Sequence, residues 1–535
     1  MQKHFKKILF CIIFLSGFLV WGNASAANWY VDNEASGSDN GTSWTNAWPS
    51  FASIIWASIQ PGDTLYISGG TESKTYSERL VVGASGDAGN PITIQVGQDS
   101  GHNGVVIIDG ATTGNYSGIT IQDKHYIKVS GQVGTGSSQN IKVQNFYFNG
   151  VYITGAPSNL EIAYIETEQN DRAMAAGAYG FRLSSTALAT GLQAEIHHCK
   201  FHNNQWDSEV IFNQTYTGAR TSYDQIKFHD NEIYDAHNDW LNIQAEGVSV
   251  YDNIFGPRGV KYVGHPDVIQ AWSGYCKIYN NTFAGVHIAE DNAGNSMIRF
   301  NPQTSNNPDP SYIWIYNNLF HQEQVAFYES ENYQRGIELS PQPGTTLNHL
   351  YFMNNTMVGV NFFGFILIFN TDHTTSQVSD IVIANNLFQD CSIANNNTRG
   401  ANSVISLGEG GDGSITFGKW GDSVDVIFDY NTVYASSVDW STNSKFEGIN
   451  YSWANFISQS GTNTHPANAT QNPALNANYK PTVNSPYSNA GVDLSAYFTT
   501  DNDGNARSNW SIGAYEYTGA DDIIAPASPT GLSVN

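Results

Sequence analysis

The sequence contains little cysteine, with four residues in a chain of 535. Cys11 falls in an apolar N-terminal run, which leaves three cysteines far apart in the chain: Cys199, Cys276 and Cys391. An odd number of cysteines at such spacing argues against a disulfide framework, and none has the short spacing of a zinc site. We therefore expect these three residues to be buried core thiols that lie on strands.

Positive charge is also scarce. Lys and Arg total 23 against 48 Asp and Glu, so the formal net charge is −25. The expected N-terminal export signal carries three lysines and no acid, so its removal takes the mature chain to −28. A chain this acidic argues against nucleic acid as a partner. It also repels an anionic polysaccharide at long range, so a uronate substrate would need a locally basic groove or a bridging Ca²⁺.

Long hydrophobic runs are missing except near the N-terminus. Lys3, Lys6 and Lys7 precede the apolar run 8–21, and the small residues 24–26 follow it as a cleavage site. This order is typical of a secretory signal peptide. No later stretch reaches the roughly 18 consecutive apolar residues of a membrane span. We expect cleavage near Ala26, a secreted extracellular monomer and no membrane partner.

The sequence is instead rich in asparagine, glycine and aromatic residues, and the asparagines repeat. An alternating apolar strand, two Asn or Asp residues and a further apolar segment recur along the chain. The paired positions are 230–231, 252–253, 280–281, 317–318, 354–355 and 385–386, and they lie 22, 28, 37, 37 and 31 residues apart. A fixed motif at unequal spacing predicts a solenoid with loops of variable length on one face. Asn tolerates left-handed φ and its amide can bond the equivalent Asn one coil away, so we expect an asparagine ladder.

This repeat resembles the pectate-lyase-like right-handed parallel β-helix superfamily. The resemblance implies an all-β solenoid with three strands in each coil and the Asn ladder in the second turn, between the second and third strands. It also implies that the first strand of each coil follows the variable loop. Those strands are expected at 180–184, 209–213, 241–244, 268–272, 297–301, 336–340 and 365–369. Residues 1–26 would be the signal peptide, 27–517 a single solenoid with its cap and closing segment, and 518–535 a linker or tail.

Strand alternation predicts which side chains of the first strands point away from the core. With the apolar positions inward, the outward set is rich in amides and arginines: Arg182, Ser184, Asn242, Gln244, Gln270, Trp272, Arg299, Asn301, Glu338 and Ser340. We interpret this face as a sugar-binding groove. The residues expected to bind substrate are Arg182, His237, Asn242, Gln244, Gln270, Trp272, Asn301 and Arg335.

Much of the scarce positive charge falls on or near this face, which favours an anionic polysaccharide as the partner. The residues are Arg172, Arg182, Arg258, Lys261, Arg299 and Arg335. Arginine forks pair bidentately with carboxylates. The alternative is that these are loop arginines that bond backbone carbonyls.

A His-x-Asp unit precedes two successive first strands, as His237-Asn-Asp239 and His265-Pro-Asp267. Adjacent rungs are about 4.8 Å apart, so we expect the two units to stack beside the groove. Carboxylates at that range can share a Ca²⁺ or work as an acid and base. If Ca²⁺ is a cofactor, Asp239 and Asp267 are its expected ligands. The alternative is turn-forming aspartates with satisfied histidines.

The superfamily resemblance implies a polysaccharide lyase that cleaves a uronate-containing glycan by β-elimination. This reaction must neutralise the uronate carboxylate and then remove the proton at C5. Arg299, Arg182 or a Ca²⁺ on the two aspartates would neutralise the carboxylate. The candidate bases are Lys261, Tyr262 and His265. No lysine projects from the expected first strands, which departs from several lyase families.

Three alternatives use the same face. A glycoside hydrolase would take its acid and base from Asp239, Asp267 and Glu338, with a separation of about 5 Å for retention and about 6.5 to 9.5 Å for inversion. An epimerase would act on the same uronates. A non-catalytic glycan-binding adhesin would use aromatic platforms such as Trp240 and Trp272. The clustering of titratable groups in one place favours an enzyme over the adhesin.

Overall fold

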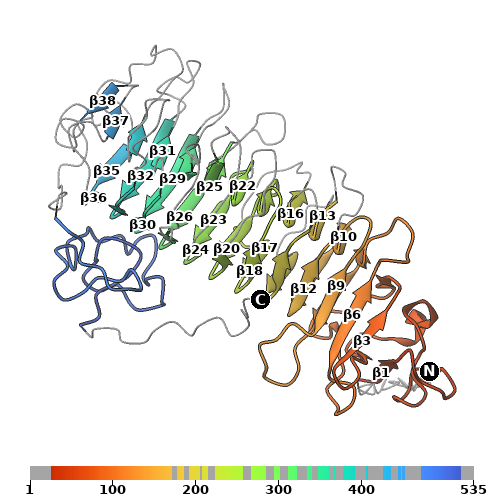
Figure 1. Ribbon diagram of the computed structural model, residues 1–535. Helices are drawn as coiled ribbons and strands as arrows, with labels where there is room; N and C mark the ends of the chain where they lie inside the picture. Colours follow the sequence, from red (N-terminus) through yellow and green to blue (C-terminus); the bar gives the residue numbers. More distant parts are fainter. Residues whose placement is uncertain are drawn as a thin grey trace, which may run out of the picture.

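The chain winds into a solenoid of stacked coils (Figure 1). A computed structural model describes residues 26–170, 178–185, 192–204, 208–214, 223–256, 267–284, 295–301, 311–321, 334–339, 347–360, 365–367, 378–391, 405–407, 426–434, 444–446, 449–451 and 471–519. Each coil gives one strand to each of three sheets, called here sheets A, B and C. Within the described residues these sheets hold 13, 12 and 13 strands. Every pair of neighbouring strands runs parallel except the last pair in sheet C.

The strands of sheet A are β1 (Asn28–Val31), β2 (Thr64–Ile67), β5 (Ile92–Val96), β8 (His125–Ser130), β11 (Ser158–Ala163), β14 (Ala194–His197), β17 (Ile226–His229), β20 (Val248–Tyr251), β23 (Cys276–Tyr279), β26 (Ile313–Tyr316), β29 (Leu347–Met353), β32 (Val378–Ala384) and β35 (Val426–Asp429). The strands of sheet B are β3 (Ser73–Tyr76), β6 (Val105–Asp109), β9 (Ile141–Gln144), β12 (Ile165–Glu168), β15 (Lys200–His202), β18 (Glu232–Tyr234), β21 (Ile254–Phe255), β24 (Thr282–Ala284), β27 (Leu319–His321), β30 (Thr356–Val358), β33 (Leu387–Gln389) and β36 (Thr432–Tyr434).

The strands of sheet C are β4 (Leu80–Val81), β7 (Ile119–Gln122), β10 (Val151–Gly155), β13 (Phe181–Ser185), β16 (Val210–Gln214), β19 (Leu241–Ile243), β22 (Ile269–Ala271), β25 (Asn295–Phe300), β28 (Gln334–Leu339), β31 (Phe365–Leu367), β34 (Ile405–Leu407), β37 (Ser444–Phe446) and β38 (Ile449–Tyr451). Two short 3₁₀ helices near the N-terminus, η1 (Phe51–Ser53) and η2 (Trp56–Ser58), complete the regular structure of the described residues. No helix among those residues is long and apolar enough to cross a membrane.

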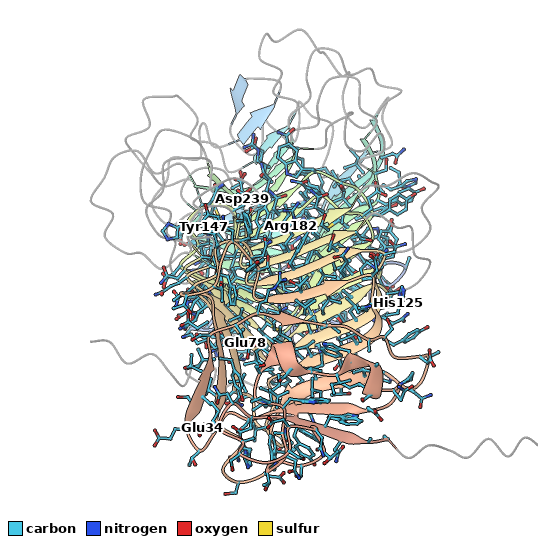
Figure 2. All side chains as sticks on the ribbon, turned by 90° about the vertical axis from the view of Figure 1, so that its right-hand side faces the viewer. Glu34, Glu78, His125, Tyr147, Arg182 and Asp239 are labelled. Carbon is cyan, nitrogen blue, oxygen red and sulfur yellow. The ribbon has the colours of Figure 1, made fainter. Side chains whose placement is uncertain are left out.

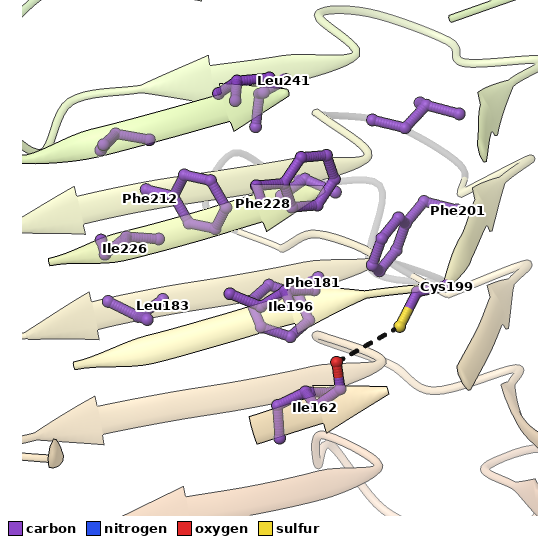
Figure 3. Close-up of a cluster of buried hydrophobic side chains, with 14 of the residues drawn as sticks. Ile162, Phe181, Leu183, Ile196, Cys199, Phe201, Phe212, Ile226, Phe228 and Leu241 are labelled. Atoms are coloured by element: carbon purple, nitrogen blue, oxygen red, sulfur yellow. Dashed lines mark hydrogen bonds between the residues drawn. The ribbon is translucent and has the colours of Figure 1, made fainter. Parts of the chain in front are cut away.

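The predicted right-handed parallel β-helix is confirmed, because parallel strands joined coil by coil build all three sheets. Sheet C contains the predicted first strands, and the chain then passes through sheet A and sheet B. The core is made by the inward residue of each alternating pair. Figure 3 shows Phe181 and Leu183 of β13 packed against Ile196, Phe201 and their neighbours, all of them buried.

The three cysteines are free and buried, as the sequence predicted. Cys199 Sγ lies 3.7 Å from the backbone oxygen of Ile162, inside the core. Burial raises the pKa of the Cys199 thiol to about 12, so it stays protonated at neutral pH.

The asparagine ladder lies in the turn between sheets A and B, which is the predicted second turn. Its members are Asn231, Asn253, Asn281, Asn318, Asn355, Asn386 and Asn431, all buried. Each Oδ1 accepts hydrogen bonds of 2.9–3.1 Å from the coil before it, as Asn318 does from the N–H and Nδ2 of Asn281. The residue before each ladder asparagine adopts positive φ, for example 54° at Asn280. The Asn-Asn pair therefore combines a left-handed turn residue with a buried hydrogen-bonding residue.

Residues 471–519 form a closing segment that folds back on this corner of the solenoid (Figure 1). The first Asn of three pairs binds it: Asn317 Nδ2 donates to Thr500 O, Asn354 Nδ2 to Ser511 O and Asn385 Nδ2 to Val492 O, at 2.7–2.9 Å. The side chain of the first Asn in each of these pairs therefore binds the closing segment, whereas the second Asn builds the ladder.

Candidate functional site

The register of sheet C brings the predicted polar residues into one row. The central row consists of Arg182, Ile211, Asn242, Gln270, Arg299 and Glu338, which are consecutive partners on β13, β16, β19, β22, β25 and β28. All six alternate with core residues and so point away from the core. Strand alternation therefore predicted the polar members of this row, whereas the apolar Ile211 was not among the predicted residues.

The central row is less open than the sequence suggested. Asn242 is 8% exposed and Glu338 only 3%, although both were expected to line an open groove. Ile211 in the same row is buried as well. The row is thus covered in part, and the half-buried side chains of Arg182, Gln270 and Arg299 are the ones that reach its surface. Trp240, considered as an aromatic platform, is fully buried in the core.

A second polar row follows the ends of the same strands. It consists of Asn213, Gln244, Trp272 and Asn301, all partly exposed. Asn213 Nδ2 donates to Gln244 Oε1 across 2.9 Å. Asn213 was missing from the predicted site, although strand alternation in 209–213 points to it. Amides beside an indole ring can hydrogen-bond hydroxyls while the ring packs on the apolar face of a sugar.

At the start of the same strands the two predicted aspartates stack one rung apart. The N–H of Asp267 donates to Asp239 Oδ1 across 3.0 Å, and the N–H of Ser296, one rung further, donates to Asp267 Oδ1 across 2.7 Å. Asn242 Nδ2 also donates to Asp239 Oδ2, at 3.1 Å. The two aspartates stack as predicted and form a ladder of carboxylate-to-backbone bonds, whereas His265 of the second His-x-Asp unit lies outside the described residues. One carboxylate oxygen of each aspartate therefore has a structural role.

Arg299 lies between two buried acids. Its Nη1 is 3.7 Å from Asp267 Oδ2 and its Nε is 3.9 Å from Glu338 Oε1. The Arg299 side chain is 18% exposed, whereas those of Asp267 and Glu338 are 0% and 4% exposed. A guanidinium has five N–H donors, so this arrangement holds the charge in place while donors remain for a carboxylate from outside.

Burial raises the pKa of Asp267 well above its usual 3.8, and the nearby charges of Asp239 and Glu338 act in the same direction. Arg299 and the N–H of Ser296 oppose the rise without cancelling it. The pKa of His237 is lowered by burial, with Asp235 opposing, so its ring is neutral at neutral pH. Burial of Asp267 thus opposes its charged form, while the permanent positive charge of Arg299 favours that form.

Arg182, at the other end of the central row, lies beside aromatic rings. Its guanidinium carbon is 5.6 Å from the ring centre of Tyr152 and 5.4 Å from that of Tyr179. Figure 2 marks Arg182 and Asp239 on the solenoid. Four rungs separate Arg182 from Arg299, which places the two cations roughly 19 Å apart along the helix axis. The row therefore offers positive charge at two points.

Several predicted residues lie outside the described part of the chain. Lys261, Tyr262 and His265 are among them, as are Arg172 and Arg258. The backbone of Arg335 belongs to β28 and pairs with Ser296, and its side chain is outside the description. The assignment of the base therefore stays a prediction.

Oxygen donors of the type that Ca²⁺ prefers are present at the predicted aspartate pair. Asp267 Oδ2 and Asn242 Oδ1 are buried and lack a hydrogen-bond partner among the described residues. However, Arg299 already provides positive charge beside Asp267 Oδ2. The predicted pair fits Ca²⁺ in donor chemistry, and binding there stays a prediction.

A different group of side chains, on sheet B, has the geometry to hold a metal. Among the described residues, the ligand atoms of Glu166, Glu168 and His202 lie within 4.8 Å of one another. Lys142 Nζ lies 3.3 Å from Glu166 and 2.7 Å from Glu168, so an ammonium group already neutralises these acids. Sequence reasoning missed this group because its members come from two coils, on β12 and β15, more than 30 residues apart in the chain.

Comparison with known proteins finds similarity in the fold. No family profile matches the chain, and no curated protein matches it. Among solved structures, pectate lyase Pel9A is 14% identical, with 92% of this chain and 96% of that chain covered and a TM-score of 0.42. The lacto-N-biosidase of family GH136 from Eubacterium ramulus is 12% identical, covering 59% and 68%, with a TM-score of 0.35. An alginate lyase from a Paenibacillus species is 12% identical, covering 56% and 96%, with a TM-score of 0.36.

Proposed function

We propose that this chain is an exported polysaccharide lyase that cleaves a uronate-containing glycan by β-elimination along sheet C. The observation that carries the proposal is Arg299, a permanent cation held between Asp267 and Glu338 at the surface of the central row. Acidic residues outnumber basic ones two to one in the chain, so a cation fixed on a row of amides marks a position for an anionic group.

The row supplies the steps of the reaction that bind and polarise the substrate. Arg299 would pair with the uronate carboxylate, which withdraws charge and acidifies the proton at C5. Gln270, Gln244 and Asn301 would hydrogen-bond the sugar hydroxyls, and Trp272 would pack on a ring. A base then removes the C5 proton, and the bond from C4 to the glycosidic oxygen breaks as the double bond forms between C4 and C5. The departing oxygen leaves with the electron pair of that bond and takes up a proton from the protonated base or from water. Lys261, Tyr262 and His265 remain the proposed bases.

Calcium is a separate part of the proposal. Asp239, Asp267 Oδ2 and Asn242 Oδ1 would hold the ion, which would supply a second positive charge for the substrate carboxylate. If Arg299 alone neutralises the carboxylate, activity survives a chelator. If Ca²⁺ shares this role, activity falls in chelator and returns on adding Ca²⁺ but not Mg²⁺, which needs a smaller octahedral site.

The decisive experiment incubates the mature protein with a panel of uronate polysaccharides and follows the ultraviolet absorbance of the unsaturated uronate end. Wild type should generate this absorbance, and Arg299→Ala should lower kcat/KM about 100- to 1000-fold because a charge-stabilising contact in the transition state is lost. Arg299→Lys should recover only part of that loss, since a lysine cannot make the bidentate contact. Arg79→Ala is the matched control, because this arginine packs on Tyr116 beside β4, at the N-terminal end of sheet C and seven rungs from Arg299.

Hydrolysis is the second candidate, and the raised pKa of Asp267 is the observation that favours it. A carboxyl with a raised pKa holds its proton more readily than a free one, so Asp267 could act as a general acid with Asp239 as its partner. The complete burial of Asp267 works against direct contact with a substrate. New reducing ends without new ultraviolet absorbance would replace the lyase by a hydrolase, and silence in both assays with measurable glycan binding would favour the adhesin.

A further inference from the structure

Arg299 belongs to a closed ring of four residues, each of which contacts the next. Asp267, on the rung before it, uses Oδ1 to accept the N–H of Ser296 and turns Oδ2 toward Arg299 Nη1. Glu338, on the rung after it, uses Oε2 to accept the hydroxyl of Ser296 at 3.0 Å and turns Oε1 toward Arg299 Nε. We call these four residues, Ser296, Asp267, Arg299 and Glu338, the Ser296 clamp.

We propose that Ser296 and Glu338 are positioning residues that hold the Arg299 guanidinium in place for the substrate carboxylate. This inference rests on the proposed function and adds two residues that touch no substrate. Ser296 is fully buried and Glu338 is 3% exposed, so neither reaches the surface of the row. Glu338, predicted from the sequence as a catalytic acid or base, thus receives a different role.

The geometry of the clamp explains why one serine controls both acids. A carboxylate has two oxygens, and in each acid one oxygen is fixed by Ser296 while the other faces the guanidinium. Rotation of either carboxylate away from Arg299 would break its bond to Ser296. Since Ser296 lies three residues before Arg299 on the same strand β25, the fixed points and the cation share one rigid element.

The distances from Arg299 to the two acids indicate that the clamp orients the guanidinium without forming hydrogen bonds to it. At 3.7 and 3.9 Å these contacts are ion pairs rather than hydrogen bonds. Arg299 Nε and Asp267 Oδ2 are both buried without a hydrogen-bond partner among the described residues. The guanidinium is therefore held by charge rather than by hydrogen bonds, and such contacts often shorten when a ligand binds.

The experiment measures calorimetric binding of uronate oligosaccharides and of their methyl esters, which lack the negative charge. Wild type should prefer the acid. Ser296→Ala should weaken acid binding about tenfold and leave ester binding within about twofold, because only the charge-dependent contact is disturbed. Ser249→Ala is the matched control, since Ser249 is equally buried and donates to the carboxylate of Asp224 on sheet A at 2.8 Å.

A double-mutant cycle and a second variant separate positioning from general destabilisation. In an Arg299→Ala background, Ser296→Ala should have no further effect on acid binding, because the residue it positions is gone. Glu338→Asp keeps the negative charge but moves it by the length of one methylene group. A similar loss of preference for the acid in this variant would therefore result from the position of the carboxylate alone. This measurement remains informative even if Ser296→Ala fails to fold.

The inference is overturned if Ser249→Ala and Ser296→Ala behave alike, or if the effect of Ser296→Ala persists without Arg299. A wild type that prefers the acid but releases no unsaturated product would end the lyase proposal and leave the clamp standing. A wild type that binds acid and ester equally would overturn both.

Discussion

At the scale of single residues, Asp267 shows how burial changes the behaviour of one carboxyl group. Its pKa is raised by burial and by the charges of Asp239 and Glu338, with Arg299 and the N–H of Ser296 opposing. The folded chain therefore holds this proton more tightly than the unfolded chain. Stability from this group is complete below the unfolded pKa of 3.8 and is lost as pH rises toward the folded pKa.

We predict that Asp267→Asn removes this loss of stability with rising pH. The difference in Tm between variant and wild type should move in favour of the variant as pH rises above 3.8. Asp230→Asn is a control of opposite sign, because the hydrogen bond from His229 lowers the pKa of Asp230. That variant should be less stable than wild type at pH 3.8 and above, and the difference should fade as pH falls below that value. If the Tm difference from wild type changed with pH in the same direction for both variants, this explanation would be wrong.

A second prediction concerns Lys142, which lies between two acids on sheet B. Lys142→Met removes the ammonium and leaves Glu166, Glu168 and His202 with ligand atoms within 4.8 Å of one another. Two carboxylates and an imidazole suit Zn²⁺. Zinc should therefore raise the Tm of the variant and leave the wild type unchanged. An equal response in both proteins, or none in the variant, would show that these ligands cannot converge on an ion.

At the scale of elements, the sequence predicted the features that depend only on the identity of neighbouring residues. The Asn pairs predicted the ladder, because a left-handed turn and a buried amide are properties of those residues themselves. Alternation predicted that Arg182 and Arg299 leave the core. It did not predict the burial of Asn242 and Glu338, since that depends on what covers the row. Ser296 escaped notice because only the register of β25 on β22 places it beside Asp267.

The ladder itself gives the element-scale prediction. Asn318→Ala removes the acceptor of Asn281 N–H and Nδ2 and the donor to Ile278 O, all buried. Asn281 Nδ2 keeps Val250 O and Tyr279 O as acceptors, which leaves the Asn281 N–H and Ile278 O as the orphaned groups. Each buried orphan costs about 1–3 kcal/mol, so the variant should lose at least about 2 kcal/mol of unfolding free energy. Hydrogen exchange should quicken first at the Asn281 amide. Asn280→Gly, which keeps the left-handed turn, should cost under about 1 kcal/mol, and equal losses would refute the ladder as the stabilising element.

At the scale of the whole molecule, the least predictable feature is how distant segments meet. The sequence indicated that residues near the C-terminus close the solenoid, but not where they dock. Arg507 shows why, because its partners lie close by in the closing segment and also far away. Its Nη2 donates to Ala514 O and to Asn317 Oδ1, both at 2.8 Å, and its Nη1 is 3.3 Å from Glu516. A contact across 190 residues has no local signature.

The same residue supports a prediction about how the closing segment relates to the site. Arg507 is completely buried, and burial lowers its pKa to about 10. Arg507→Met leaves Glu516 without its cation and several carbonyls without a donor, which should cost about 3–5 kcal/mol and release the segment from the ladder corner. The amides of Gly513 and Ala514, bonded to Asn385 O and Thr356 Oγ1, should then exchange rapidly.

Arg507→Met should affect activity much less than stability. The closing segment packs on the corner between sheets A and B, whereas the central row is on sheet C. In a solenoid each coil depends mainly on its neighbours, so kcat/KM on the cleaved polymer should stay within about twofold at temperatures where the variant remains folded. Lys480→Met removes a partly exposed ion pair with Asp503 in the same segment and should cost under about 1 kcal/mol without releasing it. If Arg507→Met abolishes activity while exchange in β25 stays slow, the closing segment takes part in the reaction and the assignment of the site to sheet C alone is wrong.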